Sequence, residues 1–442
     1  MQAVLFAAAC VHPSRSLLSA AVLARVAMYF QQAPNIWDSC VWACLTDLVL
    51  VWSALCCRTE AVIGECSDTI RIQMGLFYIG AGLWKVNTAF LNPRVSCASI
   101  YVASLAARLP GAFTPGWLVH HAIRLAPALT ISGELALGVC LVSPSRALRR
   151  CGIVLAAALH YAIVITPFPN QVAAFGVFCF GRLYFVMPAA WTSALGECFS
   201  APPASGLARR AAGGALVAAS ALATSTPGVV VDWCIPAQTL LCLIGARAIA
   251  IDARPAQPQL ASVTPPAPPA SPPLPPSQAG RAGRAMLLLL TASYVFVFQI
   301  VGIMDISATS PFSQIRQHGG SNHLLLPTSL LQRWAAKMPP GASTFGGGVV
   351  RVTWCTSDYM NALYPANLTA ELPPRASELL RAAGHIAHEY GPTVYQMLGA
   401  EIRAGIPHWQ PPRRGARAVP FPVYTIPALQ LRTMLAEASA SR

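Results

Sequence analysis

The sequence predicts an all-α polytopic membrane protein with about eight or nine transmembrane helices and a small α+β luminal segment at its C-terminus. Charged residues make up 10% of the 442 residues, and hydrophobic residues make up 55%. Ordinary soluble domains carry about 25% charged residues, so this chain has too little charge to coat a water-soluble fold. Its apolar residues also gather in long runs, as membrane-spanning helices require.

The candidate spans are apolar runs separated by short polar or proline-containing segments. The first run is short and contains Arg25, which indicates that it is not a clean span. A further short run, Tyr101–Leu109, is expected to lie at the membrane interface or to re-enter the bilayer. The expected spans are Leu17–Phe30, Ser39–Cys57, Ile70–Phe90, Ile123–Val142, Cys151–Thr166, Gln171–Met187, Leu207–Ala223, Val229–Ala250 and Ala285–Met304.

The spans and a proline-rich stretch divide the chain into four parts. Proline removes backbone donors and favours extended polyproline II, which predicts a cytosolic linker rather than a folded unit. Within the C-terminal segment, Gly346–Thr353 predicts a strand and Ala376–Ala404 one or two helices. The parts are a multi-span membrane domain (1–253), the linker (254–284), a final transmembrane helix (285–304) and a luminal or extracellular segment (305–442).

Arginine placement predicts the direction of the spans, because loops rich in Lys and Arg remain cytosolic. The loops on the opposite side, Pro167–Asn170 and Ser225–Asp232, contain neither residue. The C-terminal segment is then luminal, where Asn367 begins a glycosylation sequon. The net charge of +14 is explained by headgroup-facing loops, so the bilayer is the expected partner and nucleic acid is not. The arginines that mark the cytosolic side are Arg146, Arg149, Arg150, Arg209, Arg210, Arg247, Arg254, Arg281 and Arg284.

Polar residues inside the spans are the candidate functional residues, since a polar group is costly within a bilayer. The structural alternative for the acids and for the histidine is a hydrogen bond between helices. The candidates are Asp47, Lys85, Glu134, His160 and, at the luminal turn that follows His160, Asn170 and Gln171.

Lys85 is distinguished by composition. Of the 30 lysines and arginines in the chain, only Lys85 and Lys337 are lysines. A desolvated amine can lose its proton, whereas a guanidinium does not, so a buried lysine can act as a base or nucleophile. The alternative is a lysine that extends to the lipid headgroups, and the sequence leaves both interpretations open.

The luminal histidines predict no metal site. His385 and His388 are three residues apart on one expected helix face, but the order is not the HExxH of zinc proteases and no third ligand is evident. His318 and His323 flank a small-residue loop that follows the final span, which indicates a tight turn near the membrane. No mechanism follows from that loop alone.

The stretch from Gln73 to Lys85, QMGLFYIGAGLWK, resembles the YxxAGxxK segment of the HTTM family, the membrane domain shared with vitamin K-dependent gamma-carboxylase. The similarity continues through Leu159-His160-Tyr161 to Asn170–Phe178 and covers about Ile70–Phe185. In one respect the chain departs from the family, because Leu159 stands where the family has an aromatic residue.

The resemblance implies a catalytic base, Lys85, that deprotonates reduced vitamin K or another lipid-soluble quinol at the luminal edge. It implies carboxylase- or epoxidase-like chemistry, a luminal protein substrate, and a membrane of the endoplasmic reticulum or another endomembrane. Whether this chain is an enzyme stays open, because a fold supports many functions. The resulting catalytic candidates are Lys85, His160 and Glu134, and the substrate-pocket candidates are Asn170, Gln171 and Asp47.

Two non-enzymatic alternatives remain. A transporter or channel would line a polar path with Asp47, Glu134 and His160, although no paired Gly/Pro-broken helices occur in matching halves. A non-catalytic membrane protein would bind a partner through its luminal segment or its proline-rich linker.

Overall fold

The computed structural model describes about half of the chain. The expected spans Leu207–Ala223 and Val229–Ala250, the linker up to residue 277, and Asn367 lie outside the described residues. The expected end of the linker, 278–284, is wrong, because these residues follow the last proline of the stretch, Pro276, and begin the helix Gln278–Ala292. The described residues are 2–12, 14–30, 38–57, 62–94, 96–110, 115–166, 179, 181–183, 186–187, 278–298, 323–326, 337, 349–352, 374–385 and 424–427.

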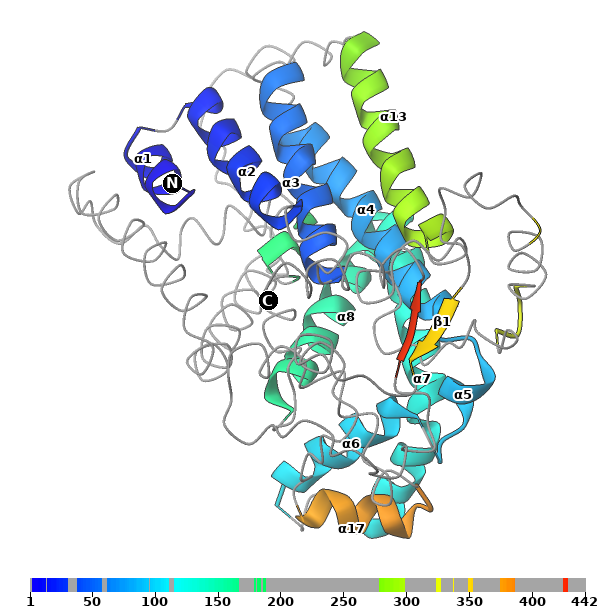
Figure 1. Ribbon diagram of the computed structural model, residues 1–442. Helices are drawn as coiled ribbons and strands as arrows, with labels where there is room; N and C mark the ends of the chain where they lie inside the picture. Colours follow the sequence, from blue (N-terminus) through cyan, green and yellow to red (C-terminus); the bar gives the residue numbers. More distant parts are fainter. Residues whose placement is uncertain are drawn as a thin grey trace, which may run out of the picture.

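The described part is mostly helical (Figure 1). Its one described sheet pairs β1 (Val349–Val352) antiparallel with β2 (Tyr424–Pro427), and β1 confirms the strand expected within Gly346–Thr353. The helices are α1 (Gln2–Val11), α2 (Arg15–Phe30), α3 (Asp38–Cys56), α4 (Val62–Trp84), α5 (Thr88–Leu91), α6 (Cys97–Arg108), α7 (Gly116–Val142), α8 (Arg146–Ile165), α13 (Gln278–Ala292), the π-helix η2 (Ser293–Val297) and α17 (Pro374–Ala382).

Several helices coincide with expected spans. α2, α3 and α8 agree with them within a few residues, and α7 ends at the expected Val142, before Ser143 and Pro144. α4 differs, because it begins eight residues before Ile70 and ends at Trp84 rather than Phe90. By length and composition, α7 is the described helix that is long and apolar enough to cross a membrane, and the apolar helices Cys40–Cys56 and Cys97–Arg108 are shorter.

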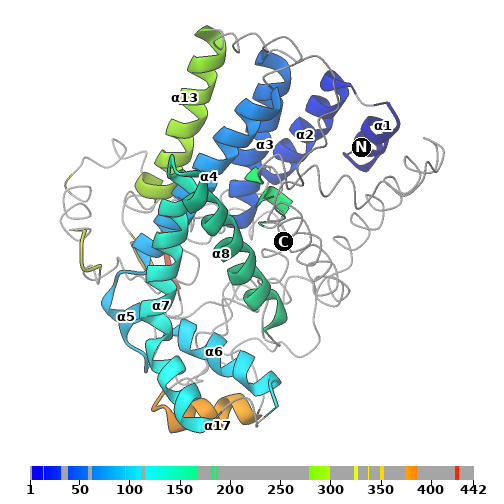
Figure 2. The ribbon, with the colours of Figure 1, turned by 180° about the vertical axis from the view of Figure 1, so that it is seen from behind.

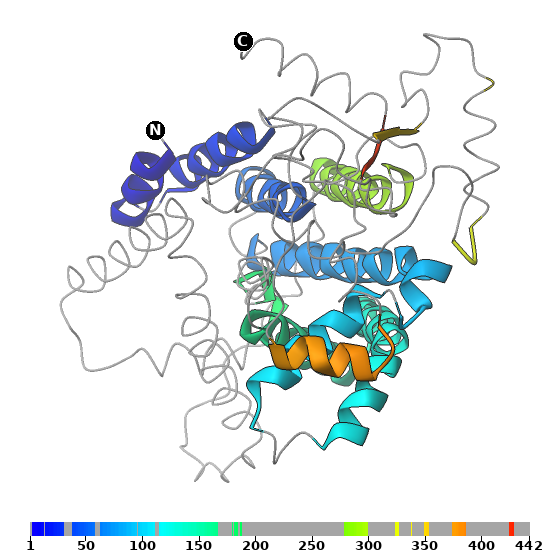
Figure 3. The same cartoon turned by 60° about the horizontal axis from the view of Figure 1, so that its bottom comes forward.

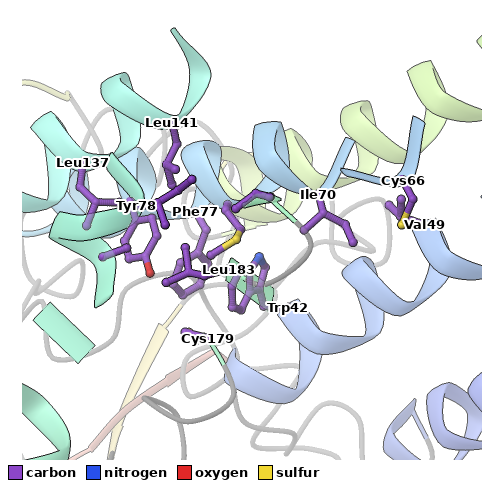
Figure 4. Close-up of a cluster of buried hydrophobic side chains, with 14 of the residues drawn as sticks. Trp42, Val49, Cys66, Ile70, Phe77, Tyr78, Leu137, Leu141, Cys179 and Leu183 are labelled. Atoms are coloured by element: carbon purple, nitrogen blue, oxygen red, sulfur yellow. The ribbon is translucent and has the colours of Figure 1, made fainter. Parts of the chain in front are cut away.

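The main core lies where α3, α4, α7, α8 and α13 meet. α2, α3, α4 and α13 run side by side, and α7 and α8 lie on the far side of α4 (Figures 1 and 2). Trp42 on α3 stacks on Phe77 of α4 with ring centroids 4.7 Å apart. Tyr78 lies beside them against Leu137 and Leu141 of α7 (Figure 4). Such interlocking of large side chains fixes the lateral position of each helix.

Glycines let α4 and α7 approach closely. A Cβ at Gly75 would lie 2.3 Å from Val142 Cγ1, and one at Gly82 would lie 2.9 Å from Leu135 Cγ. A Cβ at Gly138 would lie 2.7 Å from the Gly75 carbonyl oxygen. The contacts run in opposite order along the two helices, so α4 and α7 are antiparallel. Small residues at helix crossings are a common device of membrane bundles.

The start of α7 extends beyond this core to pack against α6 and α17 (Figure 3). The apolar side of α17 contributes Ala376 and Leu380, both fully buried, to a cluster with Ile100 of α6 and Ile123 of α7. Arg375 donates to the Leu109 carbonyl at the end of α6, with an N–O distance of 2.6 Å. The C-terminal segment therefore packs on the same end of the bundle that carries Lys85.

Candidate functional site

The antiparallel crossing of α4 and α7 brings Lys85 and Glu134 together. The Lys85 Nζ donates to both carboxylate oxygens of Glu134 at 2.9 Å. The lysine and glutamate side chains are 5% and 13% exposed. Lys85 therefore turns inward to a carboxylate rather than outward to headgroups, and Glu134 makes one of the interhelical contacts that the sequence left open.

The turn that follows α4 aims Lys85 at its partner. α4 ends at Trp84, and Lys85 N donates to the Gly82 carbonyl while its Nζ reaches the Ala81 carbonyl at 3.3 Å. Asn87 then caps α5 by accepting from Phe90 N. This cap places the Phe90 ring 5.9 Å from the Lys85 Nζ.

Apolar residues surround the pair. A buried cluster contains Phe90 from α5, Cys97 from α6 and Ile131 from α7, with Leu135 packed against it. Burial raises the pKa of Cys97 to about 12, and among the other influences Lys85 lowers it and Glu134 raises it. The lysine–glutamate pair is thus a small polar centre within an apolar wall. In such surroundings an ion pair and its neutral, proton-transferred form lie closer in free energy than in water.

α13 and η2 hold the segment before Lys85. Trp84 Nε1 donates to the Val295 carbonyl in η2 at 2.8 Å. A π-helix shifts the backbone hydrogen bonds from four to five residues apart, and such turns are frequent at functional positions. Eleven residues earlier on α4, the Gln73 amide donates to Thr291 Oγ1 at 2.9 Å. α13 and η2 therefore fix α4 at two levels.

His160 is buried on α8, where it faces α4 rather than the lysine. Its Nε2 is hydrogen-bonded to the Tyr78 hydroxyl, and its side chain is 1% exposed. Tyr78 and Lys85 are seven residues apart, which is two helical turns, so both lie on the face of α4 that meets α7 and α8. The Tyr78–His160 pair therefore neighbours the Lys85 centre along one face of α4.

Asp47 lies among arginines. Arg25 Nε on α2 donates to Asp47 Oδ2 at 2.7 Å, and Arg182 binds Oδ1 at 3.2 Å. The Asp47 side chain is 1% exposed. Arg25 predicted that Leu17–Phe30 is not a clean span, and α2 is a helix of 16 residues that continues through Arg25. The buried carboxylate on α3 compensates the charge of Arg25 there. Asp47 thus holds three segments together, which agrees with the interhelical alternative for this residue, and its place in a substrate pocket stays a prediction.

The remaining candidates are placed only in part. Asn170, Gln171, His318 and His388 lie outside the described residues. His385 is buried after α17, with its Nε2 3.0 Å from the Ser96 carbonyl oxygen. Within the described ranges no group of three His, Cys, Asp or Glu side chains is arranged to hold a metal ion.

The sequence indicates the polar residues but not their partners. Tyr78 is part of the motif that carries the family resemblance, but nothing in its spacing pairs it with His160. The Arg25–Asp47 pair had a usable signal, because two opposite charges in neighbouring apolar runs favour a mutual contact. His323 was noted as a loop residue, yet its contact with α4 depends on a docking that no local pattern predicts.

Comparison with known families finds a match only in the C-terminal segment. The model of a domain of unknown function, DUF8388, matches residues 321–442, which include His323 and α17. The HTTM family does not appear in that comparison, so the resemblance at Gln73–Lys85 stays a prediction. No curated protein and no solved structure matches the chain.

Proposed function

We propose that this chain is a multi-span membrane protein whose Lys85–Glu134 pair deprotonates a lipid-soluble quinol such as reduced vitamin K. The observation that carries the proposal is the buried amine, 2.9 Å from both oxygens of a carboxylate on an antiparallel helix. The resemblance to the HTTM family supports the same residue as the base. Carboxylase- or epoxidase-like chemistry would follow from the quinolate.

Exposed apolar side chains support the multi-span arrangement. A water-soluble protein rarely exposes large contiguous apolar patches, and these positions are suited to lipid instead. They occur on several helices, including the one that passes the length and composition test for a membrane span. Examples are Leu18, Leu23 and Met28 on α2, Leu125, Leu129 and Val139 on α7, Val154 and Leu155 on α8, and Met286, Leu289 and Leu290 on α13.

An ion pair and a hydrogen bond near the start of α4 support the proposed orientation. At its start, Glu65 binds Arg284 at 3.0 Å, and Arg71 donates to the Leu141 carbonyl at 2.6 Å. These contacts gather the beginning of α13 and the end of α7 at one end of the bundle, together with the arginine-rich start of α8. A cytosolic location of this end places Lys85 and the C-terminal segment on the luminal side.

The chemistry of the residues around Lys85 is compatible with a quinol. The apolar wall of Phe90, Ile131 and Leu135 suits a hydrophobic ring, and the amine–carboxylate pair suits its hydroxyl. When bound, a quinol supplies an acidic O–H and a ring that delocalises the resulting charge. Transfer of the ammonium proton to Glu134 leaves a neutral amine at Lys85 Nζ, which then accepts the quinol proton.

Replacement of Lys85 tests the proposal in membranes supplied with reduced quinone. Lys85→Arg keeps a cation beside Glu134 but removes the base, so turnover should fall by about 10² to 10⁴-fold. Lys337→Arg is the matched control, since Lys337 is the other lysine and is exposed. Full turnover by Lys85→Arg would refute the proposal. A Glu134→Gln variant separately tests the proton acceptor.

The geometry does not favour the transport alternative. A water-filled path needs polar groups that face a common channel. The three side chains proposed to line such a path are instead held by partners on neighbouring elements. Asp47 binds arginines, Glu134 binds Lys85 and His160 binds Tyr78.

A further inference from the structure

His323 attaches the C-terminal segment to the turn that carries Lys85. Its Nε2 is 2.9 Å from the Leu83 carbonyl oxygen, and Leu324 N donates to the Val86 carbonyl at 3.0 Å. The imidazole also packs edge-on against Trp84, with ring centroids 5.7 Å apart. The Leu83 and Val86 carbonyls flank Lys85 in the chain, so the loop 323–326 is hydrogen-bonded to the backbone on both sides of the lysine.

The hydrogen bonds of His323 define its protonation state. Nδ1 accepts from Leu325 N at 3.1 Å and from Leu326 N at 2.9 Å. A nitrogen that accepts hydrogen bonds carries no proton, so the proton is on Nε2, which donates to Leu83. Protonation of Nδ1 would place a donor against two backbone donors and would break the loop. Only the neutral imidazole satisfies every one of these contacts.

We propose that His323 is a positioning residue for Lys85, which holds the loop 323–326 on the α4 turn while its imidazole is neutral and releases that loop on protonation. The docking of the loop by His323 does not depend on what Lys85 does. The effect of this docking on Lys85 as a base rests on the proposed function.

The electrostatic surroundings agree with this direction. Burial lowers the pKa of His323, and the hydrogen bond to the Leu83 carbonyl opposes that shift. The titratable and charged groups that the described elements bring to this end of the bundle include Lys85, Glu134, Cys97, Arg94 and His385, and the first two neutralise each other. A lowered pKa in the docked state means that docking is complete above the ordinary imidazole value of about 6.5 and weakens as pH falls below it.

The test measures docking directly on the full chain in mild detergent. Amide hydrogen exchange of the peptide containing Leu325 and Leu326 is followed between pH 7 and pH 5, with correction for intrinsic exchange. Below pH 6.5 the protection of these amides should fall by up to about tenfold per pH unit. Acylation of Lys85 relative to Lys337, the other lysine, is measured on the same samples and should rise as protection falls.

Two variants separate docking from folding. His323→Gln keeps an acceptor and a donor but does not titrate, so protection and the Lys85/Lys337 labelling ratio should stay flat with pH. His323→Phe keeps the ring against Trp84 but removes both sets of hydrogen bonds, so the ratio should be high at every pH. A wild-type profile that is flat, or one that His323→Gln reproduces, overturns the proposal. Normal docking with inactive Lys85 would instead refute only the proposed function.

Discussion

The close approach of α4 and α7 should depend on Gly138 and not on Gly133, although both lie on α7. A Cβ at Gly138 would lie 2.6 Å from Ile79 Cγ1, 2.7 Å from the Gly75 oxygen and 2.9 Å from Ile79 N. Two of these atoms belong to the backbone, so the helices themselves would have to separate. At Gly133 a Cβ would meet nothing within 4 Å. The two positions therefore differ in contact while sharing one helix.

The expected difference follows from two opposing effects. Each Gly→Ala change stabilises a helix by about 0.5–1 kcal/mol, which both variants share. Overpacking at Gly138 adds a cost of about 1–3 kcal/mol, so Gly138→Ala should be less stable than Gly133→Ala by about that amount. Denaturant titration in one detergent measures the difference, and acylation of Lys85 relative to Lys337 reports whether the pair with Glu134 opens. If Gly138→Ala proves as stable as Gly133→Ala, the inferred crossing is wrong.

Further predictions concern other buried groups. Asp47→Asn leaves two arginines without their carboxylate and should lower the free energy of unfolding by about 3–5 kcal/mol; a loss below 1 kcal/mol in denaturant titration would contradict the role of this ion pair. Tyr78→Phe should cost about 1 kcal/mol, the value of one buried hydrogen bond, in the same assay. Cys97 should resist maleimide at pH 8, since burial raises its pKa to about 12, and rapid labelling detected by mass spectrometry would show that it is not buried. Asn367→Gln should abolish a glycosidase-sensitive gel shift if the C-terminal segment is luminal.

Element type and several boundaries followed from the sequence for simple physical reasons. The apolar run that becomes α7 ends at Val142, because a serine and a proline follow it. β1 lies within a stretch of β-branched residues between glycines and a tryptophan, a pattern that favours a strand. The start of α4 does not follow from an apolar run, because the first turns of this helix carry Glu65 and Asp68. Those acids face the end of the bundle, where Glu65 reaches Arg284.

The candidate site was predicted in its residues but not in its pairing. The rarity of lysine singled out Lys85, and the cost of charge in an apolar run singled out Glu134. Their contact depends on the antiparallel register of α4 and α7, which glycines fix at positions far apart in the sequence. A one-turn shift of either helix would move the partner by about 5.4 Å, beyond hydrogen-bond range. No pattern local to either helix contains that register.

Charge complementarity among apolar runs carries more information than the individual charges do. Arg25 and Asp47 looked like separate anomalies in adjacent runs, yet each explains the other once α2 and α3 lie side by side. Lys85 and Glu134 likewise explain each other once α4 and α7 are neighbours. An unpaired charge in an apolar environment is costly, so opposite charges in different runs constrain which helices are neighbours. Because the Lys85–Glu134 pair meets that constraint, its structural role alone explains why both residues are buried, and only the Lys85→Arg variant, which preserves the ion pair, separates that role from catalysis.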